Sequence, residues 1–340
     1  MLNTASLWKL RYSHWYKPVD EPILGYTILL PVPGDLPVFL KIALEICSTQ
    51  KLDGLFEALV IPDQFVPGFA ELLQTWQDKH YYPIRLINPN PLEQLISRYQ
   101  NNPHNNHWLQ LVRGVNTTRT THVLLHDADL FITEDIFMKT HYETCKSENL
   151  ACLGVSPVWD TWYKEQGINH IAATWEMMFN VDWMRSFHPW EHRGHDSEIA
   201  GKAHTFDTTL LPQCKTKPEL IKYHQQEWGF IHFNYVICTY RWFQKSKGSF
   251  EDECFRILLI RLLINVFDTS SWKYQVPELD ELIKGITDKN NAVTYVQQKT
   301  RSQYFEFRTK LQTLIDSQLL DSEKASILYD GADKFDKAFS

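Results

Sequence analysis

The sequence predicts an α/β protein in which a mostly parallel sheet is flanked by helices and followed by a helical C-terminal region. Over roughly the first 150 residues, short apolar runs that suit strands alternate with runs whose apolar residues repeat at helical spacing. From Phe250 onward the strand-like runs stop and the apolar spacing is helical. The chain of 340 residues can bury a substantial core, in one large domain or in two smaller ones.

Each expected strand is followed by an expected helix. The strands are Tyr26–Val32, Glu57–Asp63, Pro83–Pro89 and His122–Leu125. The helices are Leu36–Cys47 with Asp35 as its cap, Gly68–His80, a helix beginning near Pro91, and Trp108–Thr118 after the polar loop NNPHNNH. Strands that alternate with helices in this order form a parallel sheet, and ligands bind such sheets beyond the carboxyl ends of the strands.

The rest of the chain is less regular. "ACLGVSPV", which starts at Ala151, and the aromatic stretch Trp228–Phe243 are expected to contain strands. Cys254–Phe267 is apolar around two arginines, which indicates a buried docking helix or, alternatively, a helix on a membrane surface. We expect residues 1–150 to form the ligand-binding half of a domain, residues 151–248 to complete it, and residues 249–340 to form a helical extension.

The composition excludes several classes of protein. A net charge of −7 argues against a nucleic-acid partner, which would favour a basic excess. An apolar content of 44% and a charged content of 22% are ordinary for a soluble globular protein. The sequence has no C-x-x-C pair, no apolar segment typical of a secretory signal, and no apolar run long enough to span a membrane. We therefore expect a cytoplasmic protein without a transmembrane segment.

Two carboxylates, Asp127 and Asp129, come directly after the strand His122–Leu125. Alternate residues of an extended chain point to the same side, so both carboxylates can face one ligand. Paired carboxylate oxygens suit a hard divalent cation such as Mg²⁺ or Mn²⁺. Pro31, Val32 and Asp63 stand at the carboxyl ends of two other expected strands, so the sheet rule places them at the same ligand site.

Three segments of the first half resemble the nucleotide-binding half of GT-A-fold glycosyltransferases, particularly those similar to family 2. They are "TILLPVPGDLPVFLKIALEICSTQ", "EALVIPDQ" and "LVRGVNTTRTTHVLLHDADLFITEDIF". As is common in that family, a glycine, Gly114, precedes the first acid of the D-x-D motif by 13 residues. The resemblance covers less than half of the chain. It implies a GT-A-like fold and a metal-dependent hexosyltransferase that moves a sugar from a nucleotide-diphosphate sugar to an acceptor hydroxyl with inversion.

The resemblance also implies roles for individual residues in binding the donor. Asp127 would lie near the donor ribose and the metal, and Asp129 would ligate Mn²⁺ or Mg²⁺ bridging the diphosphate. Asp63 would contact the base or the ribose, and Arg113 would contact the pyrophosphate. His232 would be a late metal ligand, because several GT-A families recruit a C-terminal histidine; the alternative is a histidine of the core.

An inverting transferase also needs a carboxylate that accepts the proton of the acceptor hydroxyl. "FDTTLLPQ" resembles the stretch where many of these enzymes place that acid, so Asp207 is the first candidate, although it could equally be the cap of a helix. Asp196 and then Glu198 are the next candidates.

Further polar and aromatic residues suggest contacts to the acceptor. His192 and His195, with Arg193, could hold phosphate or acceptor, and Trp175 and Glu176 fall where an acceptor platform is expected. The acceptor itself stays open: a glycan, a lipid or a small molecule, with peripheral membrane contact compatible with each.

Three other functions have to be compared with this hypothesis. A haloacid-dehalogenase-like phosphatase would use Asp127 as its nucleophile, but its D-x-D motif normally opens the domain. A nucleotidyltransferase would need a glycine-rich loop after the first strand, which this sequence lacks. A non-catalytic GT-A-like binding protein would keep the fold without the chemistry.

Overall fold

The computed structural model describes residues 4–12, 15, 21–77, 79–100, 102–245, 254–285 and 297–339. The chain forms two compact units, and each unit is made of several separate segments of the sequence. The first unit comprises Met1–Gly34, Gln50–Ala128 and Glu134–Gly229, and the second comprises Asp35–Thr49, Asp129–Thr133 and Phe230–Ser340.

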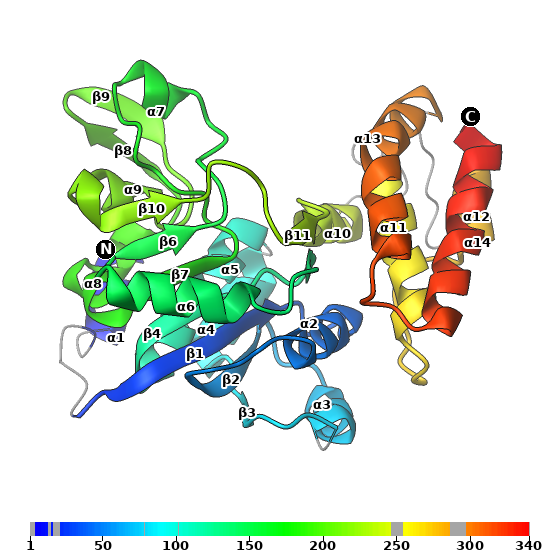
Figure 1. Ribbon diagram of the computed structural model, residues 1–340, viewed down its shortest axis with the longest axis horizontal. Coiled ribbons are helices and arrows are strands. Elements are labelled where there is room, and N and C mark those ends of the chain that lie inside the picture. The colour runs from blue at the N-terminus through cyan, green and yellow to red at the C-terminus, as the bar shows by residue number, and fades with distance from the viewer. Residues whose placement is uncertain are drawn as a thin grey trace. The chain divides into compact units, whose positions relative to one another are not determined.

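A seven-stranded sheet is the centre of the first unit (Figure 1). Its order is β10-β6-β7-β4-β1-β2-β3. The strands are β1 (Ile23–Val32), β2 (Leu55–Pro62), β3 (Ile84–Leu86), β4 (Thr120–Leu125), β6 (Cys152–Gly154), β7 (Met177–Asn180) and β10 (Ile221–Tyr223). Strand β7 is antiparallel to its neighbours β4 and β6, and the other neighbouring pairs are parallel. The prediction of a mostly parallel α/β fold is confirmed.

Helices cover both faces of this sheet because its strands are apolar on both sides. Leu29 and Val123 share a core cluster with Trp108 of α5 (Pro103–Thr117). Tyr26 and His122, whose side chains belong to the alternate set of positions, instead contact Tyr142 of α6 (Phe137–Ser147). Because side chains alternate along β1 and β4, one set of positions faces α5 and the other set faces α6.

Helix α5 begins earlier than the sequence analysis predicted. The stretch NNPHNNH, residues 101–107, was expected to form a polar loop. The helix instead starts at Pro103, and the side chain of Asn102 accepts a hydrogen bond from the backbone N–H of Asn105. An asparagine cap followed by proline at the first helical position is a recognised start signal that outweighs the polar composition.

The remaining elements of the first unit surround the sheet. They are α1 (Thr4–Arg11), α3 (Phe69–Gln77), α4 (Pro91–Gln100), α7 (Trp162–Glu165), α8 (Val181–Ser186), η1 (Pro189–His192), the hairpin β8 (Asp196–Ile199) and β9 (Lys202–Thr205), α9 (Leu210–Cys214) and η2 (Pro218–Leu220). Helices α3 and α4 lie where the sequence predicted them.

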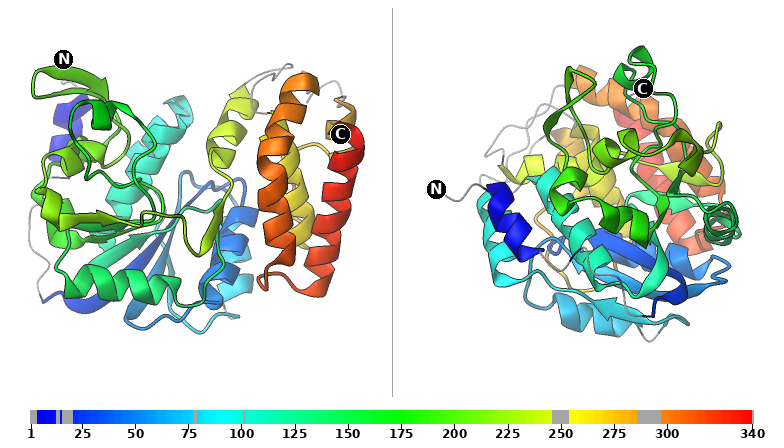
Figure 2. Two further views of the ribbon diagram at one scale, coloured as in Figure 1. Left: turned by 45° about the horizontal axis from the view of Figure 1, so that its top comes forward. Right: turned by 90° about the vertical axis from the view of Figure 1, so that its left-hand side faces the viewer.

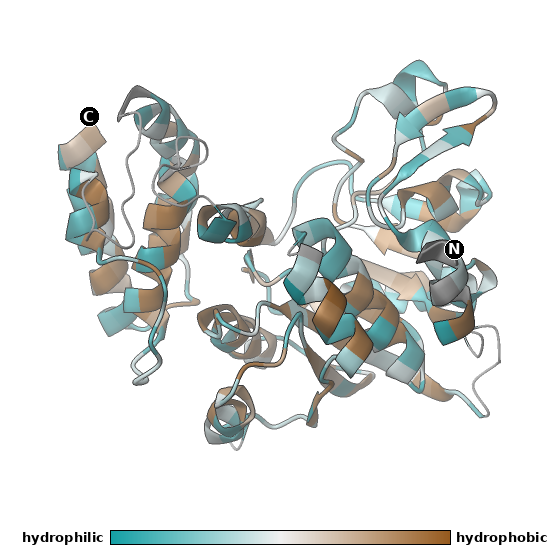
Figure 3. Cartoon of the chain, turned by 180° about the vertical axis from the view of Figure 1, so that it is seen from behind, coloured by the Kyte–Doolittle hydropathy of each residue, from teal (hydrophilic) through white to brown (hydrophobic). Residues whose placement is uncertain are grey.

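The second unit is mainly helical. Its elements are α2 (Val38–Ser48), β5 (Leu130–Ile132), β11 (Phe230–His232), α10 (Val236–Lys245), α11 (Cys254–Phe267), α12 (Leu279–Lys284), α13 (Gln297–Asp316) and α14 (Ser322–Phe339). Helices α11, α13 and α14 pack side by side (Figure 2). Hydrophobic and hydrophilic bands alternate along α14, as expected for a helix with one buried face (Figure 3). The helical C-terminal region is confirmed.

Three expectations for the second unit need comment. The apolar side chains of α11 from Phe255 to Phe267 are buried, so the buried docking helix is confirmed and the membrane-surface alternative is wrong. The strand expected over Trp228–Phe243 ends at His232, because the buried Val236, Thr239 and Tyr240 that follow have helical spacing. Asp35 does not cap α2, whose N-cap is Pro37; its carboxylate instead pairs with Arg241 at 2.8 Å.

Two general expectations can be compared with the described residues. Among the helices in these parts of the chain, none combines the length and the apolar character needed to cross a membrane. Cys47, Cys145 and Cys152 are buried, as small hydrophobic residues of a core would be.

Candidate functional site

The carboxyl edge of the sheet in the first unit brings together several predicted site residues. Pro31 and Val32 end β1, Asp63 directly follows β2, and Asp127 follows β4 after one residue. Because β1, β2 and β4 are parallel neighbours, these ends lie along one edge of the sheet. Open α/β sheets bind their ligands at this edge.

Asp63 is buried and connects two other segments of that edge. One carboxylate oxygen accepts the backbone N–H of Gly34 at 3.0 Å, and the other accepts the side-chain amide of Asn106 at 3.4 Å. The carboxylate thus fixes the loop after β1 against the first turn of α5.

Arg113 lies on α5, and its guanidinium binds other groups of the same protein unit. It pairs with the carboxylate of Glu93 at 3.1 Å and donates to the carbonyl of Pro62 at 2.6 Å. Burial lowers the pKa of this guanidinium, and the Glu93 carboxylate opposes that shift. Arg113 therefore holds the end of β2 in place, at the residue directly before Asp63.

Asp129 and His232 form a close pair within the second unit. The short strands β5 and β11 pair antiparallel, with His232 opposite Leu130, so the histidine reaches the residue before β5. The Nε2 atom of His232 is 3.4 Å from an Asp129 carboxylate oxygen, and Asp129 is only 5% exposed. Burial alone would raise the pKa of Asp129, but the hydrogen bond and charge of His232 and the backbone N–H of Val236 outweigh it and lower the pKa. Asp129 is therefore ionised at neutral pH.

Helices of the second unit hold the segment that presents His232. The backbone N–H of Val236, at the start of α10, donates to Asp129 at 3.2 Å, where the helix dipole favours an anion. Lys310 of α13 donates to the carbonyl of His232 at 2.7 Å, and Arg256 of α11 donates to that of Asn234 at 2.7 Å. Tyr235 has a left-handed backbone with φ of 66°, which turns the chain sharply into α10.

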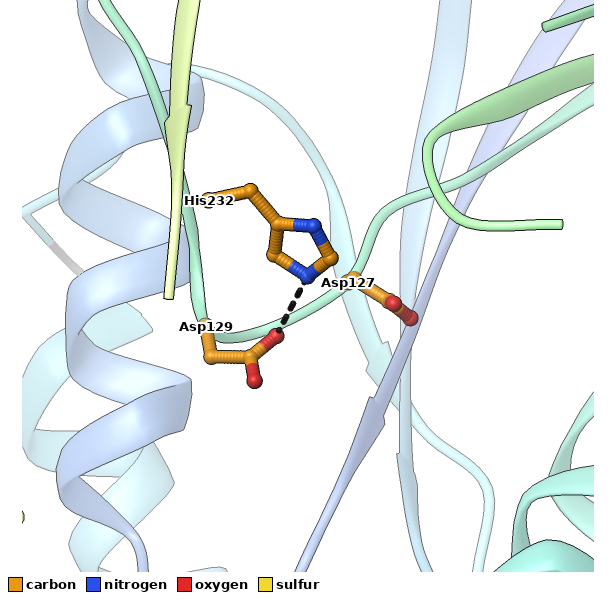
Figure 4. A group of neighbouring side chains, drawn as sticks. All are labelled: Asp127, Asp129 and His232. Atoms are coloured by element: carbon orange, nitrogen blue, oxygen red, sulfur yellow. Dashed lines mark ion pairs between the residues drawn. The ribbon is translucent and has the colours of Figure 1, made fainter. Parts of the chain in front are cut away.

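Asp127, Asp129 and His232 together offer a set of metal ligands (Figure 4). One ligand atom from each lies within 4.8 Å of the others. Asp127 is separated from Asp129 only by Ala128, so the chain itself keeps the two carboxylates adjacent. Two carboxylate oxygens and one imidazole nitrogen suit Mn²⁺ well and leave positions for ligands from a substrate. The donor set therefore fits a divalent cation.

Asp207 lies in a strained loop of the first unit, before α9. Its carboxylate accepts the backbone N–H of Thr208 at 2.6 Å, and Nδ1 of His104 is 4.0 Å away. The alternative role as a helix cap is wrong, because α9 begins at Leu210 with Thr209 as its N-cap. Thr209 has φ of 67°, which is unusual for a β-branched residue and typical of strained functional loops.

Asp196 and Glu198 lie on one side of the hairpin β8–β9, and both are exposed. Asp196 accepts the hydroxyl of Thr205 on the opposite strand at 2.6 Å. The hairpin thus places Asp196 opposite Thr205, two residues before Asp207.

The three polar residues expected to hold phosphate or acceptor have different surroundings. His192 is fully buried, and its Nε2–H donates to the carbonyl of Met184 at 2.8 Å, so this ring is not available to a ligand. His195 bonds to the carbonyl of Arg193. The guanidinium of Arg193 donates to the side chain of Asn105 at 3.2 Å and lies over the ring of Trp190.

The first turn of α5 belongs to this region of the first unit, although the sequence pattern did not indicate it. Three consecutive residues, His104, Asn105 and Asn106, contact Asp207, Arg193 and Asp63 respectively. One helical turn therefore connects the acid at the end of β2 to the candidate base. The Asn102-Pro103 start signal would have revealed the turn, but only the fold brings its partners together.

A second missed feature is a buried pair behind the acid motif. His126, between β4 and Asp127, contacts Glu176 at 2.6 Å, and both side chains are fully buried. Glu176 directly precedes β7 and has a left-handed backbone with φ of 44°. Because Glu176 is buried, it can act on an acceptor only through its neighbours.

Comparison with known proteins finds distant structural similarity. No known protein-family profile and no curated protein sequence matches the chain. TarS of S. aureus in complex with UDP-GlcNAc is 10% identical, with 93% of this chain and 89% of that chain covered and a TM-score of 0.39. The mannosyltransferase PcManGT of Pyrobaculum calidifontis, in complex with GDP-Man and Mn²⁺, is 11% identical, with 97% and 88% covered and a TM-score of 0.39. The galactosyltransferase LgtC, in complex with donor and acceptor sugar analogues, is 13% identical over 49% of this chain and 62% of that chain, with a TM-score of 0.38. Because similarity this distant does not indicate a function, the function has to be inferred from the side chains.

Proposed function

We propose that the chain is a metal-dependent glycosyltransferase of the GT-A type that moves a hexose from a nucleotide-diphosphate sugar to an acceptor hydroxyl with inversion. The observation that supports it best is the group formed by Asp127, Asp129 and His232, in which Asp127 follows the carboxyl end of β4 after one residue. An acid pair that follows the end of a parallel strand, together with an imidazole, suits a cation that binds a diphosphate.

The proposed donor site uses residues from three strands. Pro31 and Val32 border the nucleotide, Asp63 accepts hydrogen bonds from its base or ribose region, and Arg113 holds the end of β2 in place. Asp127, Asp129 and His232 would hold Mn²⁺ or Mg²⁺, which neutralises charge on the departing diphosphate when bound.

Asp207 is the proposed base. Its role is to accept the proton of the acceptor hydroxyl while that oxygen attacks the anomeric carbon and the diphosphate departs. Asp196 is the second candidate for this role. The phosphatase alternative is less well supported, because the acid pair follows the fourth strand of the sheet region and not the first.

The proposal is tested by binding of nucleotide-sugars to the purified protein. Thermal unfolding is recorded with UDP- and GDP-linked hexoses, each with and without Mn²⁺, and the best donor is titrated by calorimetry. We expect one donor to stabilise the protein only when Mn²⁺ is present. Asp129→Asn should weaken that metal-dependent binding by about 100-fold or more, because one ligand charge is lost without a change in volume.

Asp53→Asn is the matched control, because Asp53 is an exposed acid paired with Lys139. Unchanged donor binding in the Asp129 variant would remove Asp129 from the site, and absence of any donor binding would contradict the proposed function. Hydrolysis of the bound donor without acceptor separates an enzyme from a non-catalytic binding protein.

A further inference from the structure

A stacked pair of tryptophans lies in the first unit, and the proposed donor site does not use it. The rings of Trp159 and Trp175 are 4.8 Å apart between centroids and inclined by 28°. Trp159 is 44% exposed, although an exposed indole gains nothing from the hydrophobic effect. Trp175 is half-buried beneath it. A stacked aromatic pair with one exposed ring is typical of surfaces that bind ligands with flat apolar faces.

The two tryptophans belong to the same edge of the sheet as Asp63 and Asp127. Trp159 follows β6, which is antiparallel to β7, and Trp175 precedes β7, which is antiparallel to β4. The carboxyl end of β6, the start of β7 and the carboxyl end of β4 therefore lie side by side. In the strand order, β7 is the neighbour of β4, and β6 follows it on the side opposite to β1 and β2. The tryptophan pair therefore lies beside the strand that leads to Asp127.

The backbone around the pair is firmly held. The segments that bear the two rings pair with each other, with Val158 N–H donating to Ile171 and Ala173 N–H donating to Ser156, both at 3.0 Å. Directly after Trp175, the left-handed Glu176 is locked by its contact with the buried His126. A strained, locked residue next to the half-buried ring of Trp175 indicates that the position of this ring matters to function.

The same segment is tied to the helix that follows the proposed base. The side chain of Gln213, on α9, accepts the N–H of Ala172 at 2.9 Å and donates to its carbonyl at 3.2 Å. The buried amide of Gln213 therefore ties α9, which follows the loop that carries Asp207, to the segment before Trp175.

Polar groups accompany the aromatic pair. Asp160, directly after Trp159, lies 2.9 Å from Nε2 of His204, and its other oxygen accepts the backbone N–H of Trp162. The ring of Trp162 stacks on His204 at 4.0 Å. Aromatic faces combined with carboxylate and imidazole groups provide both kinds of contact that a sugar ring offers, through its C–H face and its hydroxyls.

We propose that Trp159 and Trp175 form the acceptor platform and that the acceptor is a saccharide. This inference rests on the proposed function, since it names the substrate class for the acceptor side of the same site. A sugar ring stacks on the exposed indole, with its hydroxyls directed toward Asp160 and His204. A lipid chain would favour a continuous apolar surface without these charged groups, and an extended peptide would favour an open strand edge.

The test measures saccharide binding without any donor. A fluorescently labelled protein is applied to a glycan array, and the strongest saccharide is then titrated by calorimetry. Trp159→Leu should weaken binding by about ten-fold or more, as loss of a stacking ring does in other complexes. Trp159→Phe, which keeps an aromatic face, should stay within a few-fold of the wild type. Trp242→Leu is the matched control, because Trp242 is a similarly exposed indole on α10.

The outcomes separate this inference from the proposed function. Failure of every saccharide to bind, or equal affinity in the wild type and in Trp159→Leu, would overturn the platform. If the wild type still binds a nucleotide-sugar with Mn²⁺ in that case, the proposed function stands and only the acceptor class is wrong. If saccharides bind and no donor does, the platform stands as a carbohydrate site and the transferase is wrong.

Discussion

At the scale of single residues, the environment of Asp207 makes the proposed chemistry testable. An acceptor hydroxyl has a pKa far above 7, so a base acts mainly in the transition state. Asp207 is partly exposed, and the Thr208 N–H fixes one of its oxygens. The residue can therefore be oriented by its own loop and still reach a substrate.

Asp207→Asn should lower kcat by roughly two to four orders of magnitude, because the amide cannot accept the proton. The amide oxygen can still accept the Thr208 N–H, so the melting temperature and the affinity for the donor should change little. Steady-state kinetics, thermal unfolding and donor calorimetry on the same preparation check all three. Turnover within a few-fold of the wild type would reject Asp207 as the base and make Asp196 the next residue to test.

At the scale of elements, α5 connects several parts of the first unit. Its first turn contacts Asp63, Arg193 and Asp207, while Gln110 donates to the carbonyls of Val32 and Ile61. Gly114 permits this close approach to the sheet. A Cβ atom there would lie 2.6 Å from a methyl of Ile61 and 2.8 Å from both methyls of Leu29.

Gly114→Val should therefore lower the free energy of unfolding by about 1–3 kcal/mol, because branched carbon atoms would be forced into a filled core. Denaturant unfolding measures the change. Gly114→Ala adds less volume and gains about 1 kcal/mol of helix propensity, so it should be the milder variant. If the valine variant were as stable as the wild type, the packing of α5 on β1 and β2 would be looser than these distances indicate.

At the scale of the whole molecule, buried histidines couple stability to pH. His141 and His192 are fully buried, and burial lowers the pKa of each ring to about 4. In the unfolded chain the same rings have a pKa of about 6.5. Between these values the unfolded state binds more protons, so a fall in pH favours unfolding.

We expect the free energy of unfolding to decrease as the pH falls from about 6.5 to about 4, by about 2 kcal/mol per ring at pH 5. Denaturant titrations at pH 7 and pH 5 measure this loss. In His192→Gln a neutral amide can replace the Nε2–H donor that binds Met184, so part of the pH dependence should disappear. An unchanged pH dependence in this variant would mean that His192 is already protonated, or exposed, in the folded protein.

The second unit also bears on function at this scale. Its helices α11 and α13 hold the carbonyls of Asn234 and His232 through Arg256 and Lys310. The C-terminal helices, which the sequence analysis treated as an extension, thus position a proposed metal ligand. Sequence could not show this, because the contacts join residues that are 22 and 78 positions apart.

The sequence by itself determined the strand–helix alternation, the helical C-terminal region and the place of the acid pair after β4. These features follow from local periodicity and from the sheet rule, so neighbouring residues suffice to predict them. A local signal also exists for the start of α5, because Asn102 and Pro103 form a cap despite the polar composition around them. The change from strand to helix after His232 depended on burial, which an aromatic-rich stretch does not reveal.

Only the tertiary structure decided which residues meet. His126 finds Glu176 because β7 turns antiparallel beside β4, and His232 finds Asp129 because β11 pairs with β5. Trp159 and Trp175 stack because two segments of the chain pair across the edge of the sheet. A side chain's partners depend on strand order and direction, which are set by long-range pairing and burial and not by the residues on either side of it.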